Sequence, residues 1–531
     1  MPDIIGRTAA PIIIGSGAAG TAAALALARL GIRPTMLDVG HSDPGVGPKV
    51  QGNLYDYRKR HDTFDLFIGE EFQGVADVLK DEVGVAKLNA PNMTFITQAA
   101  ETLSPVETTD FDPIQSFALG GLGNGWGSGL YRFTDDDVAG FPIRAVDLAP
   151  YFDALTGEIG ISGADDDLAP YFGATTGLLP PLKLSYNAEK VYASYRRKRQ
   201  TLAGRGVVLG RPRLGVLSVE KDGRAACDYS NTEFWQDAPY LYTPAVTLKR
   251  LIATGQIDYR PGLLAQSWTE TPEGVTVCAS EVHTGRAVEF AGGALLLAAG
   301  AIGTSKIVLA SQRDYKTVLP LLENPAVLIP FVLPPSIGRA LDTHVFGLTQ
   351  LNLIWESDAF GCRAQGSFLE LTSPMRAEFF GRFPLSARAN LRLVHDMLPA
   401  MLLMQLYLPG SAQPPARLSL KEGGVLRIEG CPNAVEVKKL GGLLAALRSL
   451  GLWTLPMLIQ KSATGHAIHY AGTLPMSETP ARYQCDPTGK LAGSRRVYVA
   501  DSACFSALPA KNMSFGMMAN AMRIAEGAAL A

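Results

Sequence analysis

The sequence predicts a mixed α/β (α+β) fold, in which a Rossmann-like nucleotide-binding domain is combined with a second, discontinuous domain built on an antiparallel sheet. Residues 11–40 have the pattern of a strand, a glycine turn, a helix and a second strand. Residues 295–311 repeat the first three of these elements. Between residues 312 and 464, apolar runs separated by prolines indicate the strands of the other domain.

The first segment has the features of a dinucleotide-binding unit. It reads PIIIGSGAAGTAAALALARLGIRPTMLDVG. Gly15 allows the tight turn, Gly17 lets the backbone approach a pyrophosphate, and Gly20 lets the helix pack closely on the strand. The phosphates would lie at the positive end of the helix. Asp38 is placed to accept hydrogen bonds from a ribose hydroxyl and would repel a 2′-phosphate, so we expect an adenine dinucleotide without that phosphate. Because strand, helix and acidic residue occur together, nucleotide binding is favoured over a merely buried turn.

Composition limits what can be built around this unit. The chain has 531 residues, of which 47% are hydrophobic and 18% charged, enough for a large core and two domains. The net charge of -2 predicts no nucleic-acid-binding surface. Its 6 cysteines are far apart in the sequence, which favours free thiols in a reducing compartment. The first residues lack the pattern of a secretory signal, so we expect a cytoplasmic protein.

Residues 116–129 form an unusual glycine-rich stretch, SFALGGLGNGWGSG, with Trp126 near its centre. A loop that covers a cofactor is favoured over a flexible linker, because a linker would not carry an indole followed by further aromatic residues. The stretch is followed by three consecutive aspartates, residues 135–137. Adjacent side chains cannot converge on one ion without further ligands, so we expect a capping or surface role rather than a metal site.

Two apolar segments follow in the second half. The small residues Ala298 to Ala301, at the end of a buried strand, would allow close approach to the cofactor. The segment Met397 to Leu408 is strongly apolar but too short to span a bilayer. A core strand is favoured there over monotopic membrane contact, which stays the alternative. Met401 to Leu408 and Arg417 to Leu420 are predicted to be strands of a sheet that could form the floor of a substrate cavity.

The residues with reactive side chains are concentrated near the C-terminus. His466 and His469 are two of only 7 histidines, and they have no third ligand at suitable spacing, so no metal is expected. Asp501 ends an apolar strand, where it could reach a ribityl chain or a phosphate. Asn512 begins the last helix, and its amide could either cap that helix or point into a site.

The order and spacing of these motifs resemble the glucose-methanol-choline (GMC) family of FAD-dependent oxidoreductases, in a bacterial branch associated with sugar or natural-product pathways. The resemblance rests on GSGAAG with Asp38, GGLGNGWG, FPIRAVDLAPYF, AAGAIGTSK, HYAGT and VADSACFSALPAKNMSFGMMANAMRIA. It implies FAD as the cofactor. His469 matches the catalytic histidine of the family's H-x-x-G-T motif, and Asn512 matches the second active-site position, which is His or Asn in the family.

The glycine turn and the resemblance together give the residues expected to bind FAD. These are Gly15, Gly17, Ala18, Ala19, Gly20, Asp38, Gly120, Gly121, Asn124, Trp126, Gly127, Ala299, Gly300, Asp501, Ser502, Asn512 and Met513. The family usually carries Asn where Trp126 stands, and proline often follows the Asn where Met513 stands. The glycine loop holds no histidine, so non-covalent FAD is expected.

The same motifs predict how the two domains share the chain. The FAD-binding domain is expected to comprise residues 1–159, 241–311 and 476–531. The substrate domain is expected to comprise residues 160–240 and 312–475.

The expected function is oxidation of an alcohol, a hydroxyl group of a sugar, glycoside or natural-product intermediate, by hydride transfer to flavin N5. A neutral imidazole can accept the hydroxyl proton near pH 7, so His469 is expected to be the general base and Asn512 to orient the substrate oxygen. The electrons would pass to oxygen or another carrier. Two alternatives stay open. One is a flavoprotein with lyase-like, non-oxidative chemistry. The other is a degenerate flavin-binding protein, for which Trp126 is the best argument and against which His469 and Asn512 stand.

Overall fold

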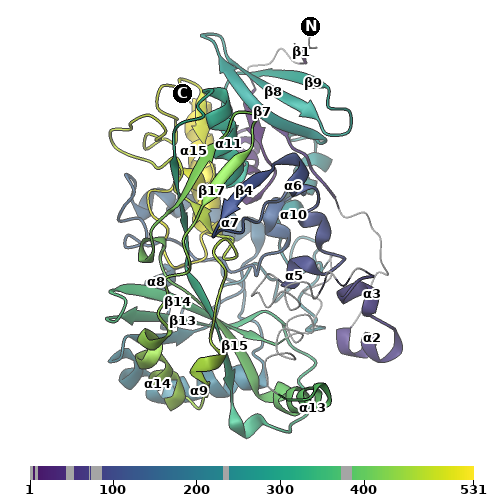
Figure 1. Ribbon diagram of the computed structural model, residues 1–531, viewed down its shortest axis with the longest axis vertical. Helices are drawn as coiled ribbons and strands as arrows, with labels where there is room; N and C mark the ends of the chain where they lie inside the picture. Colours follow the sequence, from purple (N-terminus) through teal and green to yellow (C-terminus); the bar gives the residue numbers. More distant parts are fainter. Residues whose placement is uncertain are drawn as a thin grey trace.

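The computed structural model describes residues 4–5, 10–42, 53–70, 72, 74, 86–230, 238–371 and 385–530. In these ranges the chain folds into a mixed α/β structure with four sheets, which confirms the predicted fold class (Figure 1). The helices are α1 (Ala18–Arg29), α2 (Leu54–Arg60), α3 (Phe64–Phe67), α5 (Ala86–Asn89), α6 (Ala100–Leu103), α7 (Ala145–Ile159), α8 (Ala169–Phe172), α9 (Tyr186–Ala203), α10 (Pro244–Ala253), α11 (Gly300–Ser311), α13 (Ala387–Met397), α14 (Gly441–Ser449) and α15 (Ser514–Leu530).

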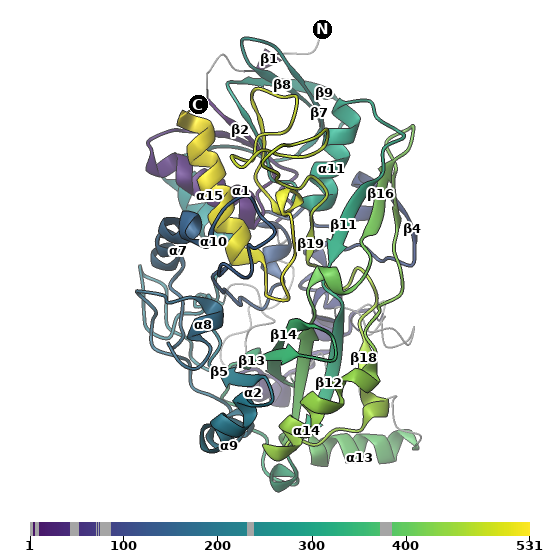
Figure 2. The ribbon, with the colours of Figure 1, turned by 90° about the vertical axis from the view of Figure 1, so that its left-hand side faces the viewer.

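A five-stranded parallel sheet is formed by the segments with the nucleotide-binding pattern. Its strand order is β20-β10-β2-β3-β6, with bounds β2 (Ile12–Ile14), β3 (Thr35–Leu37), β6 (Asp258–Arg260), β10 (Leu295–Leu297) and β20 (Val497–Val499). The central strands β2 and β10 are wholly buried, as is typical of a parallel sheet covered on both faces. Helices α1 and α15 pack against each other, and Figure 2 shows the yellow α15 beside the purple α1. The alanine-rich sequence of α1 explains this close packing, because its first ten residues are all buried.

A four-stranded sheet, ordered β1-β9-β8-β7, lies at the end of the molecule that holds the N-terminus (Figure 1). Its strands are β1 (Ile4–Ile5), β7 (Leu263–Glu270), β8 (Val275–Glu281) and β9 (Ala287–Gly292). Strand β7 packs against α11, which connects this sheet with the parallel sheet.

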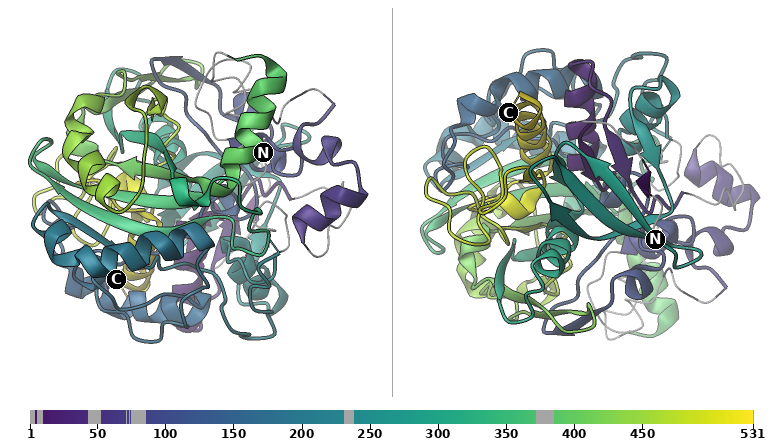
Figure 3. Two further views of the ribbon diagram at one scale, coloured as in Figure 1. Left: turned by 90° about the horizontal axis from the view of Figure 1, so that it is seen from below. Right: turned by 90° about the horizontal axis from the view of Figure 1, so that it is seen from above.

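A six-stranded antiparallel sheet, ordered β18-β12-β15-β14-β13-β5, occupies the other half of the molecule. Its strands are β5 (Val207–Gly210), β12 (Ala326–Val332), β13 (Thr349–Ser357), β14 (Cys362–Glu370), β15 (Met401–Tyr407) and β18 (Gln460–Lys461). The strand predicted within the apolar run that ends at Leu408 is therefore confirmed as the central strand β15. Helices α9 and α14 share a hydrophobic core with this sheet. Both helices lie at the end of the molecule that is seen from below in Figure 3.

A second five-stranded sheet has the order β19-β11-β16-β17-β4. Its buried hydrophobic residues belong to the same hydrophobic core as those of the parallel sheet. Its strands are β4 (Val106–Thr109), β11 (Leu319–Glu323), β16 (Ala416–Leu420), β17 (Leu426–Glu429) and β19 (Tyr470–Ala471). Strand β16 confirms the strand predicted to end at Leu420. The expectation that it shares a sheet with β15 is wrong, because β16 pairs with β11 and β17 whereas β15 pairs with β12 and β14. None of the helices in the described ranges has both the length and the apolar character needed to cross a membrane. The predicted domain boundaries stay a prediction.

Candidate active site

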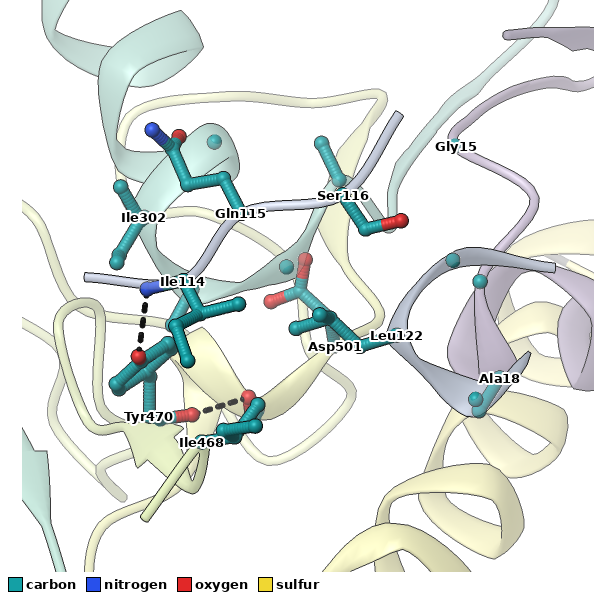
Figure 4. A pocket seen from close by; sticks show the side chains of 18 of the residues that line it. Gly15, Ala18, Ile114, Gln115, Ser116, Leu122, Ile302, Ile468, Tyr470 and Asp501 are labelled. Carbon is teal, nitrogen blue, oxygen red and sulfur yellow. Dashed lines mark hydrogen bonds between the residues drawn. The ribbon is translucent and has the colours of Figure 1, made fainter. Parts of the chain in front are cut away.

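A cavity of about 740 Å³ lies between the parallel sheet and the six-stranded sheet. Its volume is within the range typical of small-molecule and cofactor sites. The glycine turn after β2 lines one part of it, and strands β13, β14 and β15 line another. Figure 4 shows Gly15 and Ala18 on one side, Asp501 between, and Ile114, Ile468 and Tyr470 on the opposite side. Segments from the beginning, middle and end of the chain therefore share one cavity.

The positive end of α1 faces this cavity. Gly17 is the N-cap residue of α1, no side chain caps its first turn, and that turn has no acidic residue. Ala18 and Ala19 line the cavity. Backbone N–H groups that are unpaired at a helix N-terminus form a favourable site for a phosphate or another anion.

The glycines of the turn differ in what surrounds them. Gly15 has a φ of +96°, and a Cβ there would lie 2.6 Å from the carbonyl oxygen of Ala298. A Cβ on Gly20 would lie 1.9 Å from the carbonyl oxygen of Gly15, so Gly20 lies behind the cavity wall and allows helix and strand to pack closely. Added Cβ atoms on Gly17, Gly127 and Gly300, which all line the cavity, would meet nothing within 4 Å. These three positions leave room that a dinucleotide would need.

We therefore expect Gly17→Val to fold normally but to bind FAD at least about tenfold more weakly, because its side chain would occupy the space beside the helix N-terminus. The FAD content of the purified variant and the FAD dissociation constant measured by flavin fluorescence test this expectation. The matched control is Gly157→Val, since Gly157 in α7 also has nothing within 4 Å of an added Cβ but lies outside the cavity lining. Equal FAD binding by both variants would contradict the assignment of this cavity to the cofactor.

Asp38 lies at the carboxyl end of β3, and it lines the cavity although its side chain is almost fully buried. Its Oδ2 accepts hydrogen bonds from the Ser16 hydroxyl and from the Tyr259 hydroxyl, the latter at 2.9 Å. Burial raises the pKa of Asp38 to about 6, although these hydrogen bonds act in the opposite direction. Since a carboxylate has about four acceptor positions, Asp38 can still accept a hydrogen bond from a ribose hydroxyl.

Asp501 has a similar environment at the end of β20. It is buried, and its carboxylate accepts hydrogen bonds from the Thr304 hydroxyl and from the backbone N–H of Ala503, the latter at 2.9 Å. Burial raises the pKa of Asp501 to about 6. Asp501, Ser502, Ala299 and Gly300 all line the cavity, so the residues predicted at the ends of β10 and β20 lie together.

The glycine-rich loop is anchored by two side chains. The Trp126 indole N–H donates to the Tyr242 carbonyl oxygen at 2.9 Å, and Trp126 lines the cavity with Gly121 and Gly127. The Asn124 amide donates to two carbonyl oxygens of its own loop, each at 2.9 Å. Asn124 and Gly120 are not among the lining residues, so in this structure they shape the loop from behind.

His469 lies at the other side of the cavity, directly before β19. It lines the cavity, and burial lowers the pKa of its imidazole to about 4. Its Nδ1 lies 2.9 Å from Oδ1 of Asn324, and its ring lies 5.0 Å from the Tyr407 ring, centroid to centroid. The preceding residue, Ile468, has a φ of +59°, a strained conformation for a β-branched residue and one that is common at functional sites.

Asn512 approaches the same cavity from the loop before α15, which begins two residues later at Ser514. Its Oδ1 is buried and has no hydrogen-bond partner among the described residues. A buried acceptor without a partner is costly, which indicates that a bound group supplies a donor there. Met513 lines the cavity beside it.

The neighbouring Lys511 fixes this loop through a buried ion pair with Asp137, whose side chain is 6% exposed. Lys511 also donates to the carbonyl oxygens of Arg132 and Tyr171, at 3.0 and 2.6 Å. The three consecutive aspartates thus have different partners. Asp135 accepts from the Ala145 N–H at the start of α7, Asp136 pairs with Arg363, and Asp137 pairs with Lys511. No group of three or more His, Cys, Asp or Glu side chains in the described ranges is arranged to hold a metal ion.

Several residues around His469 escaped the sequence prediction. Glu323 is buried and accepts hydrogen bonds from the backbone N–H groups of Gly465 and Ala467, at 2.7 and 3.2 Å. Burial raises the pKa of Glu323 to about 7. His466, to which the sequence assigned no role, pairs with Asp112. The signal in the sequence was the polar pair Glu323-Asn324 between an apolar run and a proline, where a strand ends.

Comparison with known proteins agrees with the predicted family over one segment and with the fold over almost the whole chain. Residues 454–521 match the family model described as GMC oxidoreductase. Among solved structures, pyridoxine 4-oxidase from Mesorbium loti has a TM-score of 0.59 at 14% identity, over 98% of this chain and 99% of that one. A variant of formate oxidase from Aspergillus oryzae, studied for FAD modification, also has a TM-score of 0.59 at 14% identity, over 99% of each chain. A comparison with curated proteins found no significant match.

Proposed function

We propose that this chain is a GMC oxidoreductase, the family whose model its residues 454–521 match, and that it binds FAD non-covalently and oxidises a small neutral alcohol with His469 as the general base. Enzymes of this family act on CH–OH groups, so the match supports the predicted class of enzyme. The substrate, the roles of single residues and the cytoplasmic location are proposals.

One observation carries the proposal. His469 and Asn512 line the same cavity as the glycine turn and the uncapped N-terminus of α1. A dinucleotide with its phosphates at α1 and its ribose at Asp38 would extend from the parallel sheet toward these two side chains. The absence of histidine from the glycine-rich loop supports non-covalent FAD.

The proposed chemistry assigns one task to each side chain. When bound, FAD supplies an acceptor at N5 for the hydride that leaves the substrate carbon. His469, which burial keeps neutral near pH 7, accepts the hydroxyl proton at a ring nitrogen. Asn512 would donate from its amide nitrogen to the substrate oxygen, whose own proton goes to His469. Its buried Oδ1, which has no partner within the described part of the chain, is left to accept from another N–H or O–H group of the bound molecules.

The wall opposite the glycine turn supports a narrower substrate class. Alternate residues of β14 and β15 share the face that lines the cavity, and Ser367 pairs with Gln405 as Leu369 pairs with Leu403. Leu328, Leu348, Thr349 and Tyr407 complete this wall, which carries no acidic or basic side chain among its described residues. Such a surface favours a neutral alcohol over a charged one, and the polar groups of Ser367, Gln405 and Thr349 can hydrogen-bond further hydroxyls of a sugar, glycoside or natural product. Pyridoxine 4-oxidase, one of the structural neighbours, is named for pyridoxine.

The test is spectroscopic. The visible spectrum of the purified protein is recorded before and after acid precipitation, and a panel of aryl, terpenoid and sugar alcohols is then added without oxygen. Flavin that appears in the supernatant supports non-covalent FAD, and bleaching by one compound of the panel identifies the substrate class. Readmission of air separates oxygen from another carrier as the acceptor. Absence of bleaching by any neutral alcohol would contradict the proposed reaction, and failure to bind FAD would overturn the whole proposal.

A further inference from the structure

Asn324, at the end of β11, is the only described residue that forms a hydrogen bond with the His469 ring. The two residues are 145 positions apart in the sequence, and Asn324 is 1% exposed. A buried polar contact of this kind is well placed to control the state of an imidazole, because the two ring nitrogens of a neutral histidine differ in which one carries the proton.

The orientation of the Asn324 amide is fixed by its other hydrogen bonds. Its Nδ2 donates to the carbonyl oxygens of Leu408 and Pro509, at 2.8 and 2.9 Å. Both amide hydrogens are therefore used, and Oδ1 is left to face Nδ1 of His469 at 2.9 Å. Rotation of the amide by 180° would place Oδ1 against two carbonyl oxygens and lose both donors, so the alternative orientation is strongly disfavoured.

An amide oxygen can only accept a hydrogen bond, so Nδ1 of His469 has to carry the ring proton. In the neutral ring the other nitrogen, Nε2, is then unprotonated. We infer that Asn324 is a positioning residue that fixes His469 in the Nδ1–H tautomer and thereby leaves Nε2 as the atom that accepts the substrate proton. The tautomer follows from the hydrogen bonds alone, whereas the statement that Nε2 accepts its proton from an alcohol rests on the proposed function.

The backbone around His469 is fixed as firmly as its ring. Glu323, next to Asn324, accepts from the N–H groups of Gly465 and Ala467. Tyr470 donates to the carbonyl oxygen of Gly465 and accepts from the N–H of Ile114 at 2.9 Å. These contacts hold the turn in which Ile468 has its positive φ. The adjacent residues Glu323 and Asn324 thus hold the segment and the ring, respectively.

The first test does not depend on catalysis. Protein containing FAD and labelled with ¹⁵N-histidine is studied by NMR, and the His469 signals are identified by their absence in His469→Gln. We expect a protonated Nδ1 and an unprotonated Nε2 at neutral pH. The same measurement on Asn324→Leu is expected to show a mixture of tautomers or the opposite one. A native protein with its proton on Nε2 would overturn the inference, whether or not any alcohol reduces the flavin.

The second test compares rates of flavin reduction by a substrate found in the panel. Asn324→Leu is expected to reduce the rate constant about 10-fold to 100-fold with little change in KM, as is typical when a partner that orients a histidine is lost. Asn324→Asp keeps an acceptor opposite Nδ1, so it is expected to retain the tautomer. It does so at a cost in stability, measured by thermal unfolding, because its second oxygen would face the carbonyl oxygens of Leu408 and Pro509 without a hydrogen to donate. Its carboxylate would also raise the pKa of His469, which moves the acid limb of the pH–rate profile to higher pH.

The matched control is Asn433→Leu. Asn433 also donates from Nδ2 to two carbonyl oxygens, those of Ala326 and Ser462 at 2.8 and 3.1 Å, but its Oδ1 accepts from the Val435 N–H. A merely structural role for Asn324 predicts that Asn324→Leu and Asn324→Asp lose activity alike, with an unchanged pH profile. That outcome, or a rate in Asn324→Leu equal to that in Asn433→Leu, would overturn the inference.

Discussion

Replacement of His469 by alanine is expected to leave a folded protein that retains FAD but is reduced by substrate about 10² to 10⁴ times more slowly, the usual contribution of a general base. The loss should occur in the rate constant for flavin reduction, because His469 lines the cavity between Ile468 and Tyr470, which lie opposite Gly15 in Figure 4, and is not needed for phosphate binding. Stopped-flow absorbance without oxygen measures it. The control is His395→Ala, since His395 is an exposed histidine of α13. Reduction of His469→Ala at the native rate would disprove the assignment.

The pH dependence of the native enzyme follows from the same side chain. Burial lowers the pKa of His469 to about 4, so the ring is neutral and able to accept a proton throughout the neutral range. The rate of flavin reduction should therefore be nearly constant from about pH 6 to 8 and should fall as the pH approaches about 4, where the ring becomes protonated. A rate that declines already around pH 6.5, the ordinary pKa of histidine, would contradict the lowered pKa of His469.

Lys511→Met is expected to have the largest effect on stability, lowering the free energy of unfolding by about 3–5 kcal/mol, because it leaves Asp137 charged, buried and without its cation. The Lys511 and Asp137 side chains are 4% and 6% exposed, so solvent cannot replace the lost partner. The carbonyl oxygens of Arg132 and Tyr171 would also lose a donor. Because Asn512 is the next residue, FAD-dependent activity should fall as well. Thermal and urea unfolding measure the effect.

Two comparisons make this prediction specific. Lys511→Met combined with Asp137→Asn removes both charges, so part of the stability should return. Lys59→Met serves as the control, since Lys59 and Asp56 form an ion pair on the surface and its loss should cause little measurable change. A double variant no more stable than Lys511→Met would show that the buried charge of Asp137 is not the cause.

The local elements were predictable because each depends on a short stretch of sequence. The glycine turn after β2, the strand β15 and the helix α15 follow from apolar periodicity and glycine positions within one window. Trp126 shows the limit of this reasoning. Its place in a glycine-rich loop that lines the cavity was predictable, but its hydrogen bond to the Tyr242 carbonyl depends on a segment far away in the sequence.

Side-chain partners across long separations account for what the sequence did not reveal. The pairs Asn324–His469 and Asp137–Lys511 join segments 145 and 374 residues apart. Neither pair has a pattern of its own, because each exists only once the sheets have brought its segments together. The resemblance to a family identified His469 and Asn512 as candidate site residues, since those positions belong to motifs. It did not identify Asn324, which forms a hydrogen bond with His469.

The order of strands in the parallel sheet also determines when the protein can become active during its synthesis. The strands β2 and β3 are made first, but β10 pairs with both β2 and β20, and β20 follows almost two hundred residues after β10. At about 5–20 residues per second, a ribosome needs roughly half a minute or more to make a chain of 531 residues. For most of that time the glycine turn lacks Asp501, His469 and Asn512. Binding of the proposed FAD would therefore be a late event, and a nascent chain stalled before β20 would expose an unfinished sheet edge to chaperones or to aggregation.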